Sequence, residues 1–286
     1  MDRQDFRFFD HLRVRWAEVD MQKIVFHAHY LMYFDTAITG YWRALAMPYA
    51  EAMERLEGDL YVRKTSIEYH ASARWDDRLD IGMRCARVGN SSITIEGALF
   101  RGEQLLITGE LVYVFADPRT QTSRPVPDGL RHLLHRFEAR ESVIDVRTGD
   151  WNSLREAASL VRTKVFVEEQ GISQEDEWDE ADATAVHAVV HNRLGQEVGT
   201  GRLLHESPGV ARIGRMAVLH SLRGAGIGQA VVSALEQAAR SRGDTQVVLS
   251  AQRSAESFYR NLGYLPNGEP YEEVGIAHIP MVRSLS

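Results

Sequence analysis

The first half of the chain shows two spacings of hydrophobic residues, one typical of a helix and one typical of strands. Between Tyr30 and Leu45 the large apolar side chains recur every three or four residues, which predicts an amphipathic helix. On either side, apolar and polar residues alternate, as in strands with one buried face. The order strand, helix and four further strands predicts an α+β layer pair. The expected strands are 8–19, 65–69, 79–85, 93–99 and 105–115.

The pattern starts again near residue 140. Pro118, Pro125 and Pro127 mark residues 117–128 as a loop, and a short helix is expected over 129–139. A second complete set of elements follows, so we expect two domains, 1–140 and 141–286. The expected strands are 143–146, 186–190, 198–204, 212–218, 247–251 and 276–282, and the expected helices are 154–167, 226–240 and 255–262.

Composition excludes several classes of protein. The 286 residues carry a net charge of −7, which argues against nonspecific nucleic-acid binding. Cys85 is the single cysteine, so no intramolecular disulfide forms, and a reducing cytoplasm fits. No apolar run has the length of a signal peptide or a membrane span. We therefore expect a cytoplasmic protein with no membrane partner.

Three alternating glycines stand at a predicted strand–helix junction. Gly224, Gly226 and Gly228 lie in R-G-A-G-I-G, and Gly226 opens the helix. Gln229 in the third glycine position excludes the dinucleotide fingerprint, and no Walker sequence follows. Glycines let backbone approach an anion closely, and a helix N-terminus directs N–H groups at it. This turn predicts a phosphate-binding loop.

The surrounding sequence resembles the GNAT N-acetyltransferases. The segment R-I-G-R-M-A-V-L-H-S-L-R-G-A-G-I-G is similar to motif A of that family, and S-A-E-S-F-Y-R-N-L-G-Y is similar to the next motif. The resemblance covers residues 143–283 and implies a GNAT-like α/β domain with a mixed sheet. It also implies acetyl-CoA as the substrate and an amine, unknown from the sequence, as the acceptor.

The resemblance also implies individual roles. Tyr259 would protonate the departing CoA thiolate. The general base stays open among Glu168, Glu169, Glu272, Glu273 and His278. Backbone groups would bind the pantetheine arm at Met216, Ala217 and Val218, and backbone N–H groups would bind the pyrophosphate at Arg223, Gly224, Ala225, Gly226, Ile227 and Gly228.

A second candidate site precedes the N-terminal helix. Asp20 and His27 are seven residues apart in D-M-Q-K-I-V-F-H, with a predicted strand before them and the helix after. A helix N-terminus can polarise a thioester carbonyl, while a carboxylate attacks that carbonyl or activates water. The pattern therefore indicates thioester chemistry.

This segment resembles the hotdog-fold acyl-CoA thioesterases of the 4-hydroxybenzoyl-CoA type, over residues 6–138. The resemblance implies an antiparallel sheet around one long helix, and a homo-oligomer with active sites between subunits. It makes Asp20 the nucleophile or general base, directs the His27 N–H at the thioester oxygen and lets the His27 side chain assist. Lys23 stands where the family usually has glycine.

No cysteine and histidine set has zinc-ligand spacing, and His187 and His191 fall on a predicted strand, so no metal is expected. The leading hypothesis is a bifunctional enzyme that hydrolyses acyl-CoA thioesters and transfers an acetyl group to an amine. An acetyltransferase with a noncatalytic hotdog half, which dimerises or binds acyl-CoA, is the alternative. A nonenzymatic CoA-ligand sensor is the third hypothesis.

Overall fold

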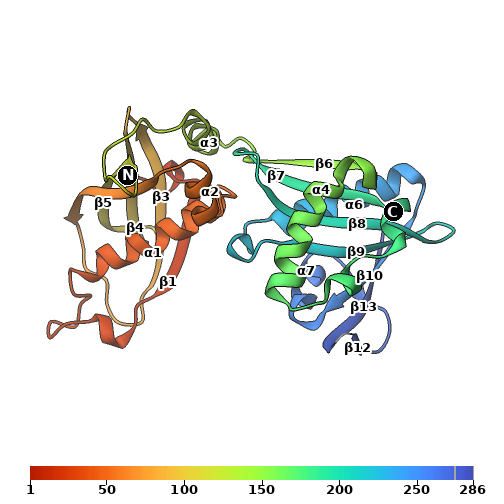
Figure 1. Ribbon diagram of the computed structural model, residues 1–286. Helices are drawn as coiled ribbons and strands as arrows, with labels where there is room; N and C mark the ends of the chain where they lie inside the picture. Colours follow the sequence, from red (N-terminus) through yellow and green to blue (C-terminus); the bar gives the residue numbers. More distant parts are fainter. Residues whose placement is uncertain (274, 286) are drawn as a thin grey trace. The chain divides into compact units, whose positions relative to one another are not determined.

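The computed structural model describes residues 1–273 and 275–285. The chain folds into two compact units, Met1–Val143 (unit 1) and Ile144–Ser286 (unit 2) (Figure 1). Within the described residues, no helix is both long enough and apolar enough to cross a membrane.

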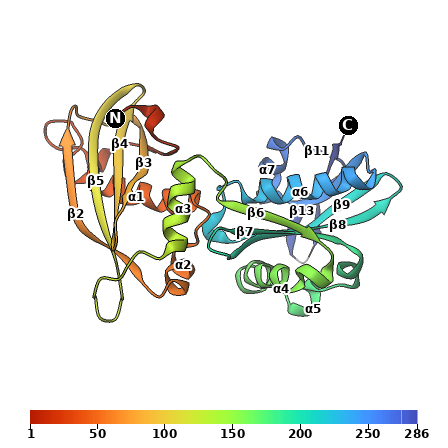
Figure 2. The same cartoon turned by 90° about the horizontal axis from the view of Figure 1, so that it is seen from above.

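Unit 1 is an antiparallel sheet wrapped around one long helix. The strands follow the order β1-β3-β4-β5-β2, and α1 lies along the inner face of the curved sheet (Figures 1 and 2). This arrangement confirms the predicted α+β hotdog fold. The elements are β1 (Phe8–Arg13), α1 (His29–Ala44), α2 (Tyr49–Arg55), β2 (Asp59–Tyr69), β3 (Arg78–Val88), β4 (Ser92–Arg101), β5 (Gln104–Ala116) and α3 (Asp128–Glu138).

A pair of glycines lets α1 approach the sheet. Gly97 of β4 and Gly109 of β5 lie directly opposite each other, and the fully buried ring of Phe34 packs on both. A Cβ atom at Gly97 would lie 2.4 Å from Phe34 Cε1, far inside van der Waals contact. The missing side chains therefore fix the depth at which the helix packs, and with it the position of the helix N-terminus.

Unit 2 is a twisted mixed sheet with helices on both faces. The strand order is β11-β13-β10-β9-β8-β7-β6, and β12 pairs with β13. Strands β9 and β10 are parallel, and the other described pairs are antiparallel. Helices α6 and α7 cover one face, and α4 and α5 cover the other (Figure 2). The elements are β6 (Ile144–Gly149), α4 (Trp151–Arg162), α5 (Gln174–Glu177), β7 (Val186–Asn192), β8 (Glu197–Ser207), β9 (Val210–Val218), α6 (Ile227–Arg242), β10 (Gln246–Gln252), α7 (Glu256–Asn261), β11 (Leu265–Pro266), β12 (Tyr271–Glu273) and β13 (Ile276–Ser284).

Two predicted elements end earlier than expected. The strand expected over 8–19 stops at Arg13, because the buried Glu18 carboxylate accepts hydrogen bonds from the Arg15 N–H and the Tyr33 hydroxyl and turns the chain. The helix expected over 154–167 is α-helical only to Arg162, and a π-helical segment (η3, Thr163–Glu169) continues it. Helix α2 was not predicted, because its two turns are too short to show a clear helical period.

Candidate active sites

A cleft opens in unit 2 where two parallel strands separate. Strands β9 and β10 pair only from Val210 to Ile213 on the β9 side, so the rest of β9 has no partner along that edge. The cleft has a volume of about 1070 Å³. Met216 and Val218 line it, whereas Ala217 is buried away from it. The open edge offers backbone hydrogen-bonding groups to an extended ligand.

The glycine turn before α6 uses left-handed backbone. Gly224 has φ 87° and Gly226 has φ 81°, a region that side chains with a Cβ atom rarely adopt. A Cβ atom at either position would meet nothing within 4 Å, so the space in front of the turn is open to the cleft. Gly228 differs, because a Cβ atom there would lie 3.2 Å from the Phe258 ring of α7. The first two glycines shape the turn, and the third allows two helices to pack.

Hydrogen bonds within the turn reduce the number of available donors. The N–H groups of Arg223 and Ala225 already donate to the carbonyls of His220 and Leu222. Within the described residues the remaining N–H groups of the expected set have no acceptor, and they belong to Gly224, Gly226, Ile227 and Gly228. These four are the ones free to meet an anion at the helix N-terminus.

The Arg223 guanidinium has a protein partner. Both of its terminal nitrogens lie 2.7 Å from the Glu169 carboxylate, and this pairing lowers the pKa of Glu169. A carboxylate held in two charge-assisted hydrogen bonds is a poor proton acceptor. Glu169 therefore positions the arginine beside the turn. It is no longer a candidate for the general base.

Tyr259 of α7 lines the cleft, and its side chain is nearly buried. Burial raises the pKa of Tyr259, so the phenol stays protonated at neutral pH. Within the described residues its hydroxyl donates to no acceptor. The hydroxyl is thus available to a ligand as a proton or hydrogen-bond donor.

Two of the five general-base candidates reach the cleft. Glu273 and His278 line it, whereas Glu168 and Glu272 do not. His278 Nδ1 lies 2.8 Å from the Ile276 carbonyl oxygen. A carbonyl can only accept, so Nδ1 carries the proton and Nε2 of the neutral ring is left as an acceptor.

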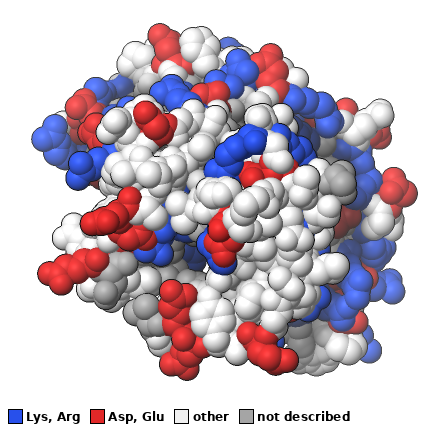
Figure 3. Space-filling view, turned by 90° about the vertical axis from the view of Figure 1, so that its right-hand side faces the viewer, with Lys and Arg blue, Asp and Glu red and all other residues white. Residues whose placement is uncertain are grey.

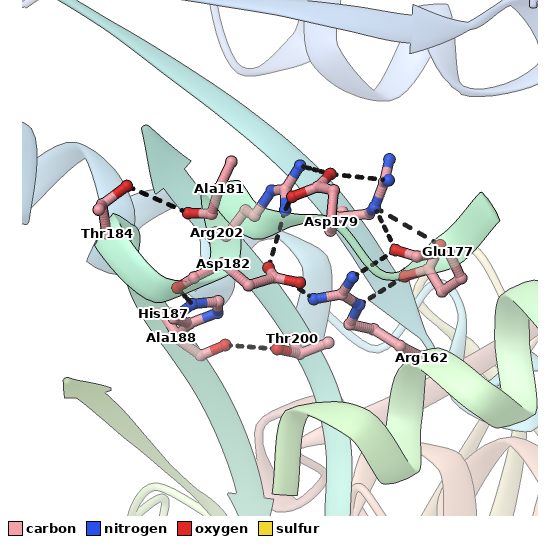
Figure 4. Close-up of polar contacts among 11 residues, drawn as sticks. Arg162, Glu177, Asp179, Ala181, Asp182, Thr184, His187, Ala188, Thr200 and Arg202 are labelled. Atoms are coloured by element: carbon pink, nitrogen blue, oxygen red, sulfur yellow. Dashed lines mark hydrogen bonds and ion pairs between the residues drawn. The ribbon is translucent and has the colours of Figure 1, made fainter. Parts of the chain in front are cut away.

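Figure 4 shows a buried ionic network, and two of its members, Glu177 and Arg202, line the cleft. Arg162 of α4 is almost completely buried, and it pairs with the carboxylates of Glu177 and Asp182. Its guanidinium also lies 4.3 Å from the centre of the Trp178 ring. Removing one partner from such a buried pair typically costs about 3–5 kcal/mol. The ion pairs therefore hold the segment after η3 against the sheet.

Arginines from neighbouring strands complete the network. Arg202 of β8 binds Asp179 at 2.6 Å and Asp182 at 2.8 Å, and Arg215 of β9 lies 3.1 Å from Asp179. Hydrogen bonds from Arg202 lower the pKa of Asp179. Blue and red side chains also lie beside one another over the face drawn in Figure 3. The acidic run of residues 174–182 was the sequence signal for this network, but its arginine partners are distant along the chain.

The candidate site in unit 1 is a tight turn. Val19 and Val25 form an isolated antiparallel bridge, and the Asp20 N–H donates to the Ile24 carbonyl. The Asp20 carboxylate accepts the Gln22 N–H at 2.8 Å through one oxygen. Lys23 has φ 63°, the left-handed conformation that glycine adopts without strain. The lysine therefore adopts a backbone conformation that favours glycine, at the position where the resemblance expects glycine.

His27 lies between this turn and α1. Its side chain is exposed, and its ring centre is 4.4 Å from that of Phe26. Among the described residues the His27 N–H has no acceptor. The Phe26 N–H donates to the Glu18 carbonyl. This hydrogen bond joins the segment between the turn and the helix to the residues that precede the turn. The structure thus leaves both expected groups, the Asp20 carboxylate and the His27 N–H, able to meet a ligand.

Comparison with known proteins assigns each unit to a family. Residues 156–285 match the model of the acetyltransferase (GNAT) domain, and the protein described as uncharacterized N-acetyltransferase YjcF of Bacillus subtilis is 38% identical over 128 residues. That alignment covers 44% of this chain and 89% of the relative. The chain belongs to the GNAT acetyltransferase family. Its N-terminal unit is a thioesterase-superfamily domain, since residues 22–108 match that model.

Solved structures resemble each unit. ElaA of Escherichia coli is 30% identical, covers 49% of this chain and 99% of its own, and has a TM-score of 0.44. The 1,4-dihydroxy-2-naphthoyl-CoA thioesterase Slr0204 of Synechocystis is 16% identical, covers 45% of this chain and 95% of its own, and has a TM-score of 0.42. The GNAT and thioesterase families both use acyl-CoA substrates.

Lys23 gives a test of the turn. We expect Lys23→Gly to stabilise the thioesterase-superfamily domain by about 0.5 kcal/mol, because relief of left-handed strain exceeds the entropy that glycine adds to the unfolded chain. Lys23→Ala is the control, since it removes the charge and keeps the strain. Hydrogen exchange in increasing urea, read on peptides from unit 1, measures the difference. Equal stability of the two variants would show that the turn is unstrained.

Proposed function

We propose that the chain is a bifunctional acyl-CoA enzyme. The GNAT domain transfers an acetyl group from acetyl-CoA to an amine, and the thioesterase-superfamily domain hydrolyses acyl-CoA thioesters. The observation that carries the first activity is the row of free N–H groups at the start of α6, at the edge of a cleft that also contains Tyr259. The Asp20 turn before α1 supports the second.

Acetyl transfer divides the work among the cleft residues. The N–H groups of Gly224, Gly226, Ile227 and Gly228 bind the pyrophosphate, and the open edge of β9 binds the pantetheine arm. The amine nitrogen attacks the thioester carbonyl, so a C–N bond forms and the C–S bond breaks. Nε2 of His278 takes the proton from the nitrogen, and the Tyr259 hydroxyl donates one to the departing sulfur.

Hydrolysis uses the free oxygen of the Asp20 carboxylate. It attacks the thioester carbonyl directly, so that the CoA thiolate leaves and water then hydrolyses the resulting anhydride, or it removes a proton from a water that attacks the carbonyl as the thiolate leaves. The N–H of His27, at the start of α1, stabilises the negative charge that develops on the carbonyl oxygen. The exposed side chain of His27 assists this step.

Acetyl transfer alone is the second candidate function. In that case the thioesterase-superfamily domain serves as a noncatalytic dimerisation or acyl-CoA-binding module. Lys23 in the family's glycine position is the observation that favours it. Release of free CoA from a panel of acyl-CoAs without any amine separates the two candidates, because only the bifunctional enzyme turns the panel over.

The edge of the unit 1 sheet supports assembly of a homo-oligomer. Strand β2 is an edge strand, and Tyr61, Val62 and Tyr69 expose large apolar surfaces on it. An uncovered, apolar edge favours pairing with a second copy of the chain. We expect light scattering at micromolar concentration to give at least twice the 32.3 kDa mass of one chain. Val62→Glu should shift the mass towards one chain, and a monomeric parent protein would contradict the assembly.

Asp20→Asn tests hydrolysis. The variant keeps an oxygen that accepts the Gln22 N–H, so the turn is retained, but the nucleophilic or basic oxygen is lost. We expect kcat for acyl-CoA hydrolysis to fall by about 10²-fold or more. Tyr259→Phe is the reciprocal control, because it should slow acetyl transfer and leave hydrolysis unchanged. Hydrolysis by Asp20→Asn at the parent rate would remove Asp20 from the chemistry.

A further inference from the structure

Arginines in the GNAT cleft are already neutralised. Among the described residues, four arginines line it, and each has a carboxylate partner. Arg202 and Arg215 belong to the buried network with Asp179, and Arg223 is paired with Glu169. Arg212 holds Glu206 through two nitrogens, each 2.6 Å from a carboxylate oxygen. A ligand carboxylate would have to displace one of these partners.

Unlike the arginines of the cleft, Glu273 has no ion-pair partner among the described residues. It lies at the end of β12 and lines the cleft, and within the described residues it forms no ion pair with a lysine or arginine. Arg212 lies within electrostatic range of it, but the Arg212 nitrogens are already on Glu206. The uncompensated charge that the cleft offers to a ligand is therefore negative.

A tyrosine with two further polar or aromatic neighbours lies beside this exposed carboxylate. The Tyr271 hydroxyl donates to Ser250 Oγ at 2.7 Å and lies 3.5 Å from Glu273 Oε2. The Tyr271 ring stacks on the His278 ring with a centroid distance of 5.8 Å. An aromatic ring and a carboxylate together are a favourable environment for an organic cation. The same hairpin carries His278, the proposed general base.

We infer that the acceptor is an alkyl diamine whose second ammonium group pairs with Glu273. The inference rests on the acetyl transfer proposed above and names the class of its acceptor. One nitrogen attacks the acetyl carbonyl as the neutral amine and passes a proton to His278 Nε2 while the CoA sulfur leaves with a proton from Tyr259. The other nitrogen stays protonated at Glu273. An acceptor with a carboxylate in place of the second ammonium would place two negative charges together.

Three amines of equal chain length test the charge preference. The α,ω-diaminopentane, pentylamine and ω-aminopentanoate probes differ only in the remote group, which is cationic, neutral or anionic. Initial rates of CoA release from acetyl-CoA, after subtraction of the rate without amine, should give kcat/KM for the diamine about tenfold above pentylamine, with aminopentanoate lowest. Equal or better use of aminopentanoate would overturn the inference.

Glu273→Gln tests the assigned residue. We expect KM for diaminopentane to rise about tenfold with kcat nearly unchanged, so that the preference for diaminopentane over pentylamine is lost. Glu272→Gln is the matched control, since the carboxylate of Glu272 is adjacent in sequence but does not line the cleft. An unchanged KM in Glu273→Gln, or an equal rise in Glu272→Gln, would overturn the assignment.

Acetyl-CoA binding, measured by calorimetry, separates failure of the inference from failure of the proposed function. If acetyl-CoA binds, Gly226→Ala weakens that binding and none of the three amines is acetylated, the diamine class is wrong and the CoA site of the GNAT domain stands. If acetyl-CoA does not bind, the proposed acetyl transfer fails, and the inference fails with it.

Discussion

Both candidate active sites depend on backbone that passes through the left-handed region shortly before a long helix. Lys23 has φ 63° ahead of α1, and Gly224 and Gly226 have φ 87° and 81° ahead of α6. Each turn directs the chain so that N–H groups near the helix start remain without an acceptor in the described chain. The partial positive charge at a helix N-terminus then suits a pyrophosphate in one unit and a polarised thioester carbonyl in the other.

Charge pairing determines what the GNAT cleft offers beyond CoA. Three buried or partly buried arginines bind the segment after η3 to the sheet, because an unpaired charge in that position would be costly. Because these three arginines are already paired with carboxylates, none of them offers an unpaired positive charge to the acceptor. In the diamine inference, Glu273 and Tyr271, on the short hairpin of β12 and β13, set the charge at the acceptor end.

Periodicity was enough to predict the α+β layers, and the G-A-G sequence was enough to predict the turn before α6. The hotdog and GNAT folds and the turn at Lys23 were predicted from the resemblance to two families. The α1 stripe and the G-A-G sequence need only local information, because side-chain period and left-handed backbone are local properties. The end of β1 and the choice of general base were not predictable. The first depends on the Glu18–Tyr33 hydrogen bond, and the second on register across the hairpin that sets His278 beside Tyr271. The Arg223–Glu169 pair joins residues far apart in sequence, so the pairing of this arginine was not predictable either.

Acetyl-CoA binding to a matched pair of glycine variants tests the central claim most directly. Gly226 and Gly243 stand at opposite ends of α6, both have positive φ, and a Cβ atom at either would meet nothing within 4 Å. Gly226→Ala and Gly243→Ala therefore introduce similar strain, but only the first changes the proposed pyrophosphate site. The account predicts that calorimetry gives at least about tenfold weaker acetyl-CoA binding for Gly226→Ala alone. Equal affinities in the two folded variants would contradict it.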